Sequence, residues 1–308
     1  METGMKQIIC ILDACSIINL IHIDEDDFLL KKLDEYIEYY LCETVFSEVC
    51  ANVYTKIDKL RNEKKIKPEE AKERKKEIDI TLSNFRQKQE KNSKIKTEFG
   101  ADFFKTVKSL TNYPKNNGEF YSTALALYIS RFKEINKKKF IGTKVFFHTD
   151  DYPAKEFFSS FFFEQQIGYI EDTADLLVLL YRLDETFTIN QLDRYLSNLF
   201  SEYAPEVSGL HKRLQKIKSS LNLKLRRDKA FIKNLDKLIY KLSEFEFFEI
   251  NEPIKFFSRN SKKYPNVYDA INHYSLVLDL QSNSTGLLEK IRKVRKEKDN
   301  VFRLGLAS

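Results

Sequence analysis

Two aspartates stand directly behind apolar segments that have the composition of buried strands. Asp13 follows Gln7–Leu12, and Asp150 follows Lys144–Thr149. The carboxyl ends of parallel strands meet at one edge of an open sheet, and ligands bind there because side chains from separate loops converge. The spacing therefore predicts that Asp13 and Asp150 lie at the same edge.

Three further acids are expected at this edge. Glu48 and Glu119 each fall within about the first turn of an expected helix, Glu48 after a strand and Glu119 after the turn Asn116–Gly118. Asp151 directly follows Asp150. Either aspartate of this pair is able to reach the site, so the sequence leaves open which one takes part.

A cluster of carboxylates has one strong chemical use. Like charges a few ångströms apart raise one another's pKa unless a divalent cation neutralises them. Mg²⁺ and Mn²⁺ prefer oxygen ligands, and such ions activate a water and stabilise the charge that develops on an attacked phosphorus. We therefore expect a site for Mg²⁺ or Mn²⁺. Its expected metal ligands are Asp13, Glu48, Glu119 and Asp150, with Asp151 as a further catalytic candidate.

Most other polar residues near these acids are expected to have structural roles. Ser16 and Asn19 orient Asp13 or a bound phosphate, although Ser16 serves equally well as a helix cap. His148 is interpreted as a packed strand residue rather than a catalytic base. No pair of cysteines has the CxxC spacing of a zinc or redox motif, so they are interpreted as inert core residues. The cysteines are Cys10, Cys15, Cys42 and Cys50.

The elements that must position the acids alternate between strand and helix. Short apolar runs of β-forming residues are each followed by a helical pattern, four times in succession, which predicts an open parallel sheet with helices on both faces. The expected strands are Gln7–Leu12, Tyr39–Cys42, Lys144–Thr149 and Ile167–Ile170. The first part of the chain is therefore expected to be an α/β domain.

Two regions depart from this alternation. Residues 55–98 are rich in Lys, Glu, Arg and Asn, and they are interpreted as an inserted helical hairpin that is largely solvated, with a helix starting at Pro68. After Asp184 the pattern is helical throughout. The expected domains are thus an α/β domain over residues 1–184, with the hairpin inserted at 55–98, and an all-helical domain over 185–308.

Charge divides the chain unevenly. Of its 308 residues, 1–184 hold 29 Lys and Arg against 31 Asp and Glu, whereas 185–308 hold 23 against 15. A basic helical part joined to an acid-bearing domain suits a protein that holds a polyanion, although Lys-rich helices are also common solvated surfaces. No apolar run approaches the ~20 residues of a membrane helix, and the start of the chain lacks a secretory pattern. We therefore expect no membrane partner and a cytoplasmic location.

The acid-bearing segments resemble the PIN-domain family of nucleases over about 185 residues, in the right order. Cys10–Leu20 resembles its opening strand, Thr44–Val49 its second motif, and Gly118–Glu119 with the following helix its third. Phe147–Asp151 is similar to the fourth motif, a strand ending in Thr and one or two Asp. The resemblance implies a PIN-like sheet and a metal-dependent endonuclease acting on RNA rather than DNA.

Other functions stay open beside the endonuclease. A catalytically inactive PIN-like fold would serve as a nucleic-acid-binding or scaffold module. A third hypothesis is a toxin or effector of a bacterial defence system, which is restrained by a regulatory protein partner or by homo-oligomerisation. The helical part is expected either to neutralise phosphates or to use the apolar faces of Ile232–Phe248 to pack on the nuclease domain or to form an oligomer. Its candidate cations are Lys212, Arg213, Lys216, Lys224, Arg226, Arg227 and Lys229.

Overall fold

The structure is a computed structural model that describes residues 8–24, 26–131, 133–135, 138–140, 144–247 and 249–304. It divides into two compact units. The first unit takes in the chain up to Thr188 and its last residues from Arg303, and the second runs from Ile189 to Phe302. The sequence places this boundary after Asp184. No described helix has an apolar stretch long enough to cross a membrane.

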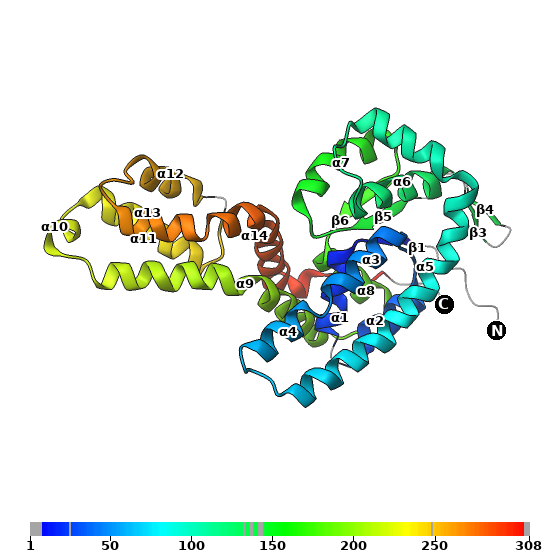
Figure 1. The fold of residues 1–308 in the computed structure, drawn as a ribbon, viewed down its shortest axis with the longest axis horizontal. Helices are drawn as coiled ribbons and strands as arrows, with labels where there is room; N and C mark the ends of the chain where they lie inside the picture. Colours follow the sequence, from blue (N-terminus) through cyan, green and yellow to red (C-terminus); the bar gives the residue numbers. More distant parts are fainter. Residues whose placement is uncertain are drawn as a thin grey trace. The chain divides into compact units, whose positions relative to one another are not determined.

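A four-stranded parallel sheet forms the centre of the first unit (Figure 1). Its strands are β1 (Ile8–Leu12), β2 (Ile37–Tyr40), β5 (Val145–His148) and β6 (Gly168–Glu171), in the order β2-β1-β5-β6. The α/β class and the parallel sheet are confirmed. The second strand ends at Tyr40 rather than Cys42, because Leu41 and Cys42 already lead into the next helix. A small antiparallel pair, β3 (Lys133–Ile135) with β4 (Lys138–Phe140), was not expected from the sequence.

Helices flank this sheet. Those of the first unit are α1 (Ala14–Ile23), α2 (Phe28–Tyr36), α3 (Glu43–Asn52), α4 (Thr55–Asn62), α5 (Pro68–Thr111), α6 (Gly118–Arg131), α7 (Tyr152–Glu164) and α8 (Thr173–Leu183). Side chains alternate along a strand, so Ile9, Ile11 and Phe147 share one face, where they pack in one core with α6 and α7. Cys10 and His148 lie on the other face, where Cys10 Sγ is 3.5 Å from His148 Nε2.

The segment expected to be a solvated hairpin packs against the domain. Helix α5 begins at Pro68 as predicted but continues to Thr111, beyond the expected end at residue 98. Its buried residues recur at helical spacing, and Phe85 lies against Tyr39 of β2 with the ring centroids 5.9 Å apart. Further along, Val107 is fully buried in the core beside α6. Ile78, Leu82 and Phe85 share one covered face of the helix, whereas Ile80 and Leu110 are exposed.

The described part of the second unit is helical. Its elements are α9 (Ile189–Ser219), α10 (Leu223–Arg226), α11 (Lys229–Ser243), α12 (Asn251–Arg259), α13 (Pro265–His273), α14 (Ser275–Lys296) and η1 (Lys298–Asn300). Phe231, Leu235 and Leu238 of α11 are buried in this unit's own core. Pro253 and Pro265 lie in the first turns of α12 and α13, where a missing backbone N–H costs nothing.

Candidate active site

Asp13 is the most deeply buried acid of the predicted set. It follows β1 directly, its backbone N–H donates to the His148 carbonyl at 3.0 Å, and its side chain is 2% exposed. One carboxylate oxygen, Oδ2, accepts from Thr149 Oγ1 at 2.9 Å and from Cys15 Sγ at 3.1 Å. The other, Oδ1, has no hydrogen-bond partner among the described residues. Burial raises the pKa of Asp13 against these hydrogen bonds, and the charge of Asp151 adds to the rise.

Glu48 is brought to Asp13 across a glycine. The backbone N–H of Gly118, the first residue of α6, donates to Glu48 Oε1 at 3.3 Å. A methyl group on Gly118 would lie 2.9 Å from Glu48 Oε2 and 3.3 Å from Asp13 Oδ1, so both carboxylates approach the same small space. Burial, followed by the charge of Asp13, raises the pKa of Glu48. Only a residue without a side chain leaves room for this approach.

The pKa of Glu119 is raised, chiefly by burial. Glu119 is the second residue of α6, and its Oε2 is buried with no hydrogen-bond partner in the described part of the chain. Burial raises its pKa to about 7, and the charges of Asp13, Asp151 and Glu48 act in the same direction. A carboxyl group in this state is half protonated near neutral pH, and a nearby cation would ionise it.

The two consecutive aspartates after β5 point to different places. Asp150 Oδ1 accepts from the backbone N–H of Thr173 at 2.8 Å, and its Oδ2 accepts from Thr173 Oγ1 at 2.6 Å and from Asn19 Nδ2 at 2.5 Å. Burial raises the pKa of Asp150 to about 6, followed by the charge of Asp172. These contacts tie the end of β5 to α1 and α8.

Asp151 instead lies with the other acids. Its charge contributes to the raised pKa values of both Asp13 and Glu119. Its Oδ1 accepts from the backbone N–H of Ala154 at 2.9 Å and so caps the start of α7. Charge effects therefore couple Asp151 to Asp13 and Glu119, whereas both carboxylate oxygens of Asp150 accept hydrogen bonds from Thr173 and Asn19.

Substitution of the two aspartates separates these roles. We expect Asp150→Ala to lower the free energy of unfolding by about 2–3 kcal/mol, because it removes the buried acceptor of the hydrogen bonds from Thr173 and Asn19. Asp151→Asn keeps a side-chain oxygen for the α7 cap and should change stability by less than about 1 kcal/mol. Urea unfolding followed by circular dichroism measures both. Equal losses of stability would contradict this division.

The sequence alone assigned no function to two residues that lie at the site, Thr149 and Asn117. Thr149 Oγ1 donates to Asp13 and accepts from the backbone N–H of Asp151 at 3.1 Å, so it links the two acids. Asn117 donates from Nδ2 to the Tyr113 hydroxyl at 3.5 Å, and its own Oδ1 is buried with no partner among the described residues. The sequence features that could have pointed to them are a Thr at the end of a strand and an Asn directly before a glycine.

The remaining sequence candidates have structural contacts. Ser16 donates to the His148 carbonyl at 3.2 Å, and Asn19 bonds to Asp150 rather than to Asp13. His148 is fully buried, with Nδ1 3.3 Å from the Asp172 carbonyl oxygen. Cys15 is half-buried, and its thiol donates to Asp13 and accepts from the backbone N–H of Asp150. Cys50 is exposed, which also departs from the core interpretation.

The donor set fits a hard divalent cation in its chemistry. It consists of carboxylate and amide oxygens, and three of them are buried without a hydrogen-bond donor from the described residues: Asp13 Oδ1, Glu119 Oε2 and Asn117 Oδ1. As they stand, however, no group of three or more described His, Cys, Asp or Glu side chains is arranged to hold a metal ion. Ligation would require the carboxylates to close in by side-chain rotation.

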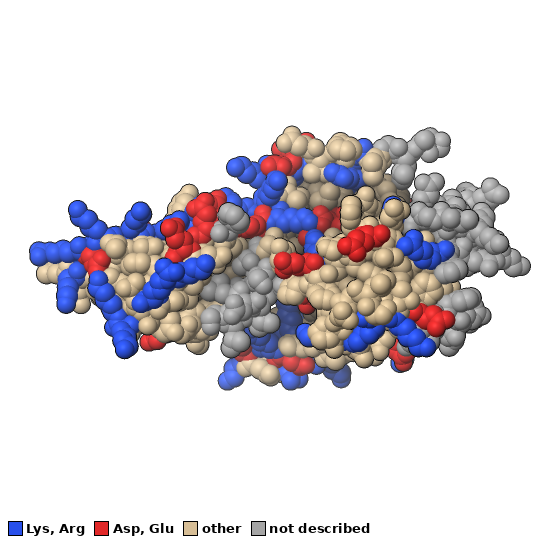
Figure 2. Space-filling view, turned by 90° about the horizontal axis from the view of Figure 1, so that it is seen from above, with Lys and Arg blue, Asp and Glu red and all other residues tan. Residues whose placement is uncertain are grey.

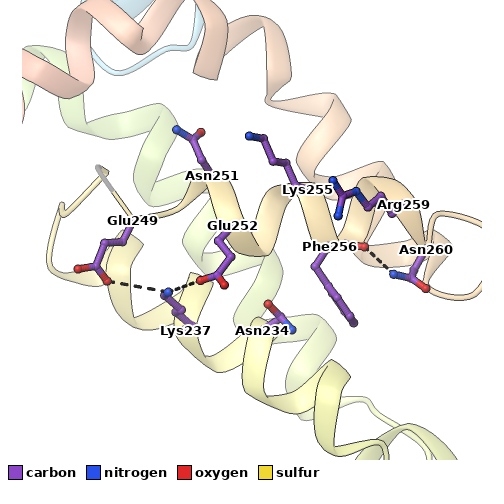
Figure 3. A pocket seen from close by; sticks show the side chains of 9 residues that line it. All are labelled: Asn234, Lys237, Glu249, Asn251, Glu252, Lys255, Phe256, Arg259 and Asn260. Atoms are coloured by element: carbon purple, nitrogen blue, oxygen red, sulfur yellow. Dashed lines mark hydrogen bonds and ion pairs between the residues drawn. The ribbon is translucent and has the colours of Figure 1, made fainter.

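The second unit holds a polar pocket between α11 and α12 (Figure 3). Lys237 pairs there with Glu252 at 2.6 Å and Glu249 at 4.0 Å. Lys255 and Arg259, one turn apart on α12, are exposed and form no ion pair with any described residue. Lys and Arg side chains also crowd the part of the surface formed by this unit in Figure 2. The pocket therefore offers two unpaired cations to an anion.

Comparisons with protein-family models, with curated proteins and with solved structures found no match to this chain. The arrangement of its own side chains therefore carries the functional assignment.

Proposed function

We propose that this chain is a divalent-metal-dependent endonuclease with a PIN-like first unit, and that it hydrolyses phosphodiester bonds of RNA in preference to DNA. One observation carries the proposal. Acids from four separate segments gather at the carboxyl edge of a parallel sheet, and two of them, Asp13 and Glu119, keep a buried oxygen that no described residue satisfies. Such an arrangement is costly unless a cation or its water completes it. The preference for RNA rests on the family resemblance.

The chain's own residues would act as follows. Asp13, Glu48, Glu119 and Asp151 would hold Mg²⁺ or Mn²⁺, which when bound supplies an activated water and charge stabilisation at phosphorus. Thr149 holds Asp13 in place by donating to Oδ2, which leaves Oδ1 directed to the shared space beside Gly118. Gly118 positions Glu48 through its backbone N–H. Glu119 must lose its proton before it binds a cation.

The test is cleavage of single-stranded RNA and DNA of mixed sequence by the purified protein. We expect cutting with Mn²⁺ or Mg²⁺, none with EDTA, and faster cutting of RNA. Mn²⁺ binding is measured in parallel by calorimetry. Absence of both cleavage and Mn²⁺ binding would overturn the proposal in favour of an inactive nucleic-acid-binding module. Mn²⁺ binding without cleavage would instead show an enzyme that requires a trigger or release from a partner.

The pocket of the second unit supplies a separate prediction about nucleic-acid binding. Lys255→Ala combined with Arg259→Ala should weaken binding of a 12-nucleotide RNA and lower the slope of log affinity against log salt by about 1.4, as for two single-strand phosphate contacts. The control, Lys262→Ala with Lys296→Ala, removes the same charge from exposed positions outside the pocket. Fluorescence anisotropy across salt concentrations measures both pairs. Identical slopes would remove the pocket from the binding surface.

A further inference from the structure

Phe157 and Phe158 of α7 form an aromatic cluster with Tyr113. Phe157 is 43% exposed, and its ring lies 4.9 Å from that of Tyr113 and 5.1 Å from that of Phe158, measured between centroids. Phe158 is fully buried and Tyr113 is 9% exposed. Phe157 is thus a solvent-facing ring supported from beneath by two buried ones.

One shared helix and one hydrogen bond connect this cluster to the segments that carry the acids. Helix α7 starts at its cap Asp151, so Phe157 stands less than two turns from that carboxylate. The Tyr113 hydroxyl accepts from Asn117, the residue before Gly118 and Glu119. Tyr113 also feels the charges of Glu119, Asp151 and Asp13, which follow burial as causes of its raised pKa.

The segment that carries Tyr113 is held in place. Lys108 near the end of α5 donates to the Tyr113 carbonyl at 2.7 Å and to Asn116 Oδ1 at 3.1 Å. The Tyr113 ring also stacks on Phe120 of α6, with the centroids 6.4 Å apart and the planes 7° from parallel. The orientation of the cluster is therefore set by contacts that do not involve Phe157, which leaves the exposed ring available.

We propose that Phe157, backed by Tyr113, is a base-stacking subsite that binds an unpaired nucleobase next to the phosphate held at the acids. This inference rests on the proposed function. A phosphodiester bound at the acids carries a base on each side, and an exposed aromatic ring is the surface on which single-stranded bases stack. Bases in a duplex already stack on one another, so the substrate class is single-stranded nucleic acid.

The experiment follows the logic of a double-mutant cycle, in which the Phe157 ring and the bases that it would contact are removed separately and together. Wild type, Phe157→Ala, Phe157→Trp and Phe163→Ala are compared on a single-stranded 12-mer and on an abasic 12-mer with the same sugar-phosphate backbone. Phe163 is the matched control, because it lies on the same helix and is 83% exposed. We expect Phe157→Ala to lower kcat/KM on the base-bearing strand about tenfold, and Phe157→Trp to restore it. Phe163→Ala should have no effect.

The abasic strand decides whether the loss comes from stacking. Phe157→Ala should leave its cleavage unchanged, whereas an equal loss on both strands would show a structural effect and overturn the inference. Equal behaviour of Phe157→Ala and Phe163→Ala on the base-bearing strand would overturn it as well. If no strand is cut and Mn²⁺ does not bind, the proposed function fails. In that case the affinity of each variant for the strands is measured by fluorescence anisotropy. The stacking subsite is supported only if Phe157→Ala weakens binding of the base-bearing strand and Phe163→Ala does not.

Discussion

Asp13→Asn is expected to lower metal-dependent cleavage more than about 100-fold, the upper range for loss of an outer-shell partner of a metal ligand. The charge that would bind the cation is removed, while Oδ2 is still able to accept from Thr149 and Cys15. Initial rates with saturating Mn²⁺ measure the loss. Residual activity within tenfold of wild type would remove Asp13 from the metal site.

The same substitution should stabilise the metal-free protein. Asp13 Oδ1 is buried without a donor from the described residues and shares its space with Glu48 Oε2. An amide group there donates to a carboxylate instead of repelling it, which is worth about 1 kcal/mol. We expect the Tm in EDTA to rise by ~2–4 °C. A variant that is both inactive and more stable separates loss of the site from loss of the fold.

Thr149→Val is the matched control for this pair of effects. It removes the hydroxyl that donates to Asp13 but keeps all the carboxylates. If Asp13→Asn were inactive because it loosens the end of β5, both Asp13→Asn and Thr149→Val would lower the Tm. Opposite shifts in Tm for the two variants are the outcome expected from the charge cluster.

The raised pKa of Glu119 predicts how the stability of the metal-free protein depends on pH. Burial raises its pKa to about 7 in the folded protein, above the value near 4.5 of an ordinary Glu. A raised carboxyl pKa means that the folded state binds the proton more tightly than the unfolded state. The resulting stabilisation is present below pH 4.5 and is lost as the pH rises through 7. Because the side chain is partly open to solvent, we expect a loss of about 2 kcal/mol between pH 5 and pH 8.

Thermal unfolding at pH 5, 6, 7 and 8 in EDTA measures this loss as a falling Tm. Glu119→Gln has no proton to lose, so its Tm should fall less and should exceed that of the wild type at pH 8. Mn²⁺ should reverse the trend, since the metal competes with the proton and binds more tightly as the pH rises. A wild-type Tm in EDTA that rises from pH 5 to pH 8 would contradict the clustered acids.

The sequence by itself determined the elements that carry the acids. An apolar run interrupted by a charge, as at Leu12–Asp13, predicts a buried strand and its end, because only a fully covered strand lacks polar residues on both faces. Four strand–helix alternations then predict a parallel sheet, and parallel strands put their carboxyl ends at one edge. That edge is where the structure has Asp13 and Asp151.

The directions of the side chains were decided only by the tertiary structure. Neighbours such as Asp150 and Asp151 point to different sides of an extended chain, so one reaches Thr173 and the other the acid cluster, and nothing local says which. The space beside Gly118 likewise depends on the distance between α3 and α6. These features arise from contacts between segments that are 23 residues apart for Asp150 and Thr173 and 70 apart for Glu48 and Gly118. A pattern of period two or four holds no information about such contacts.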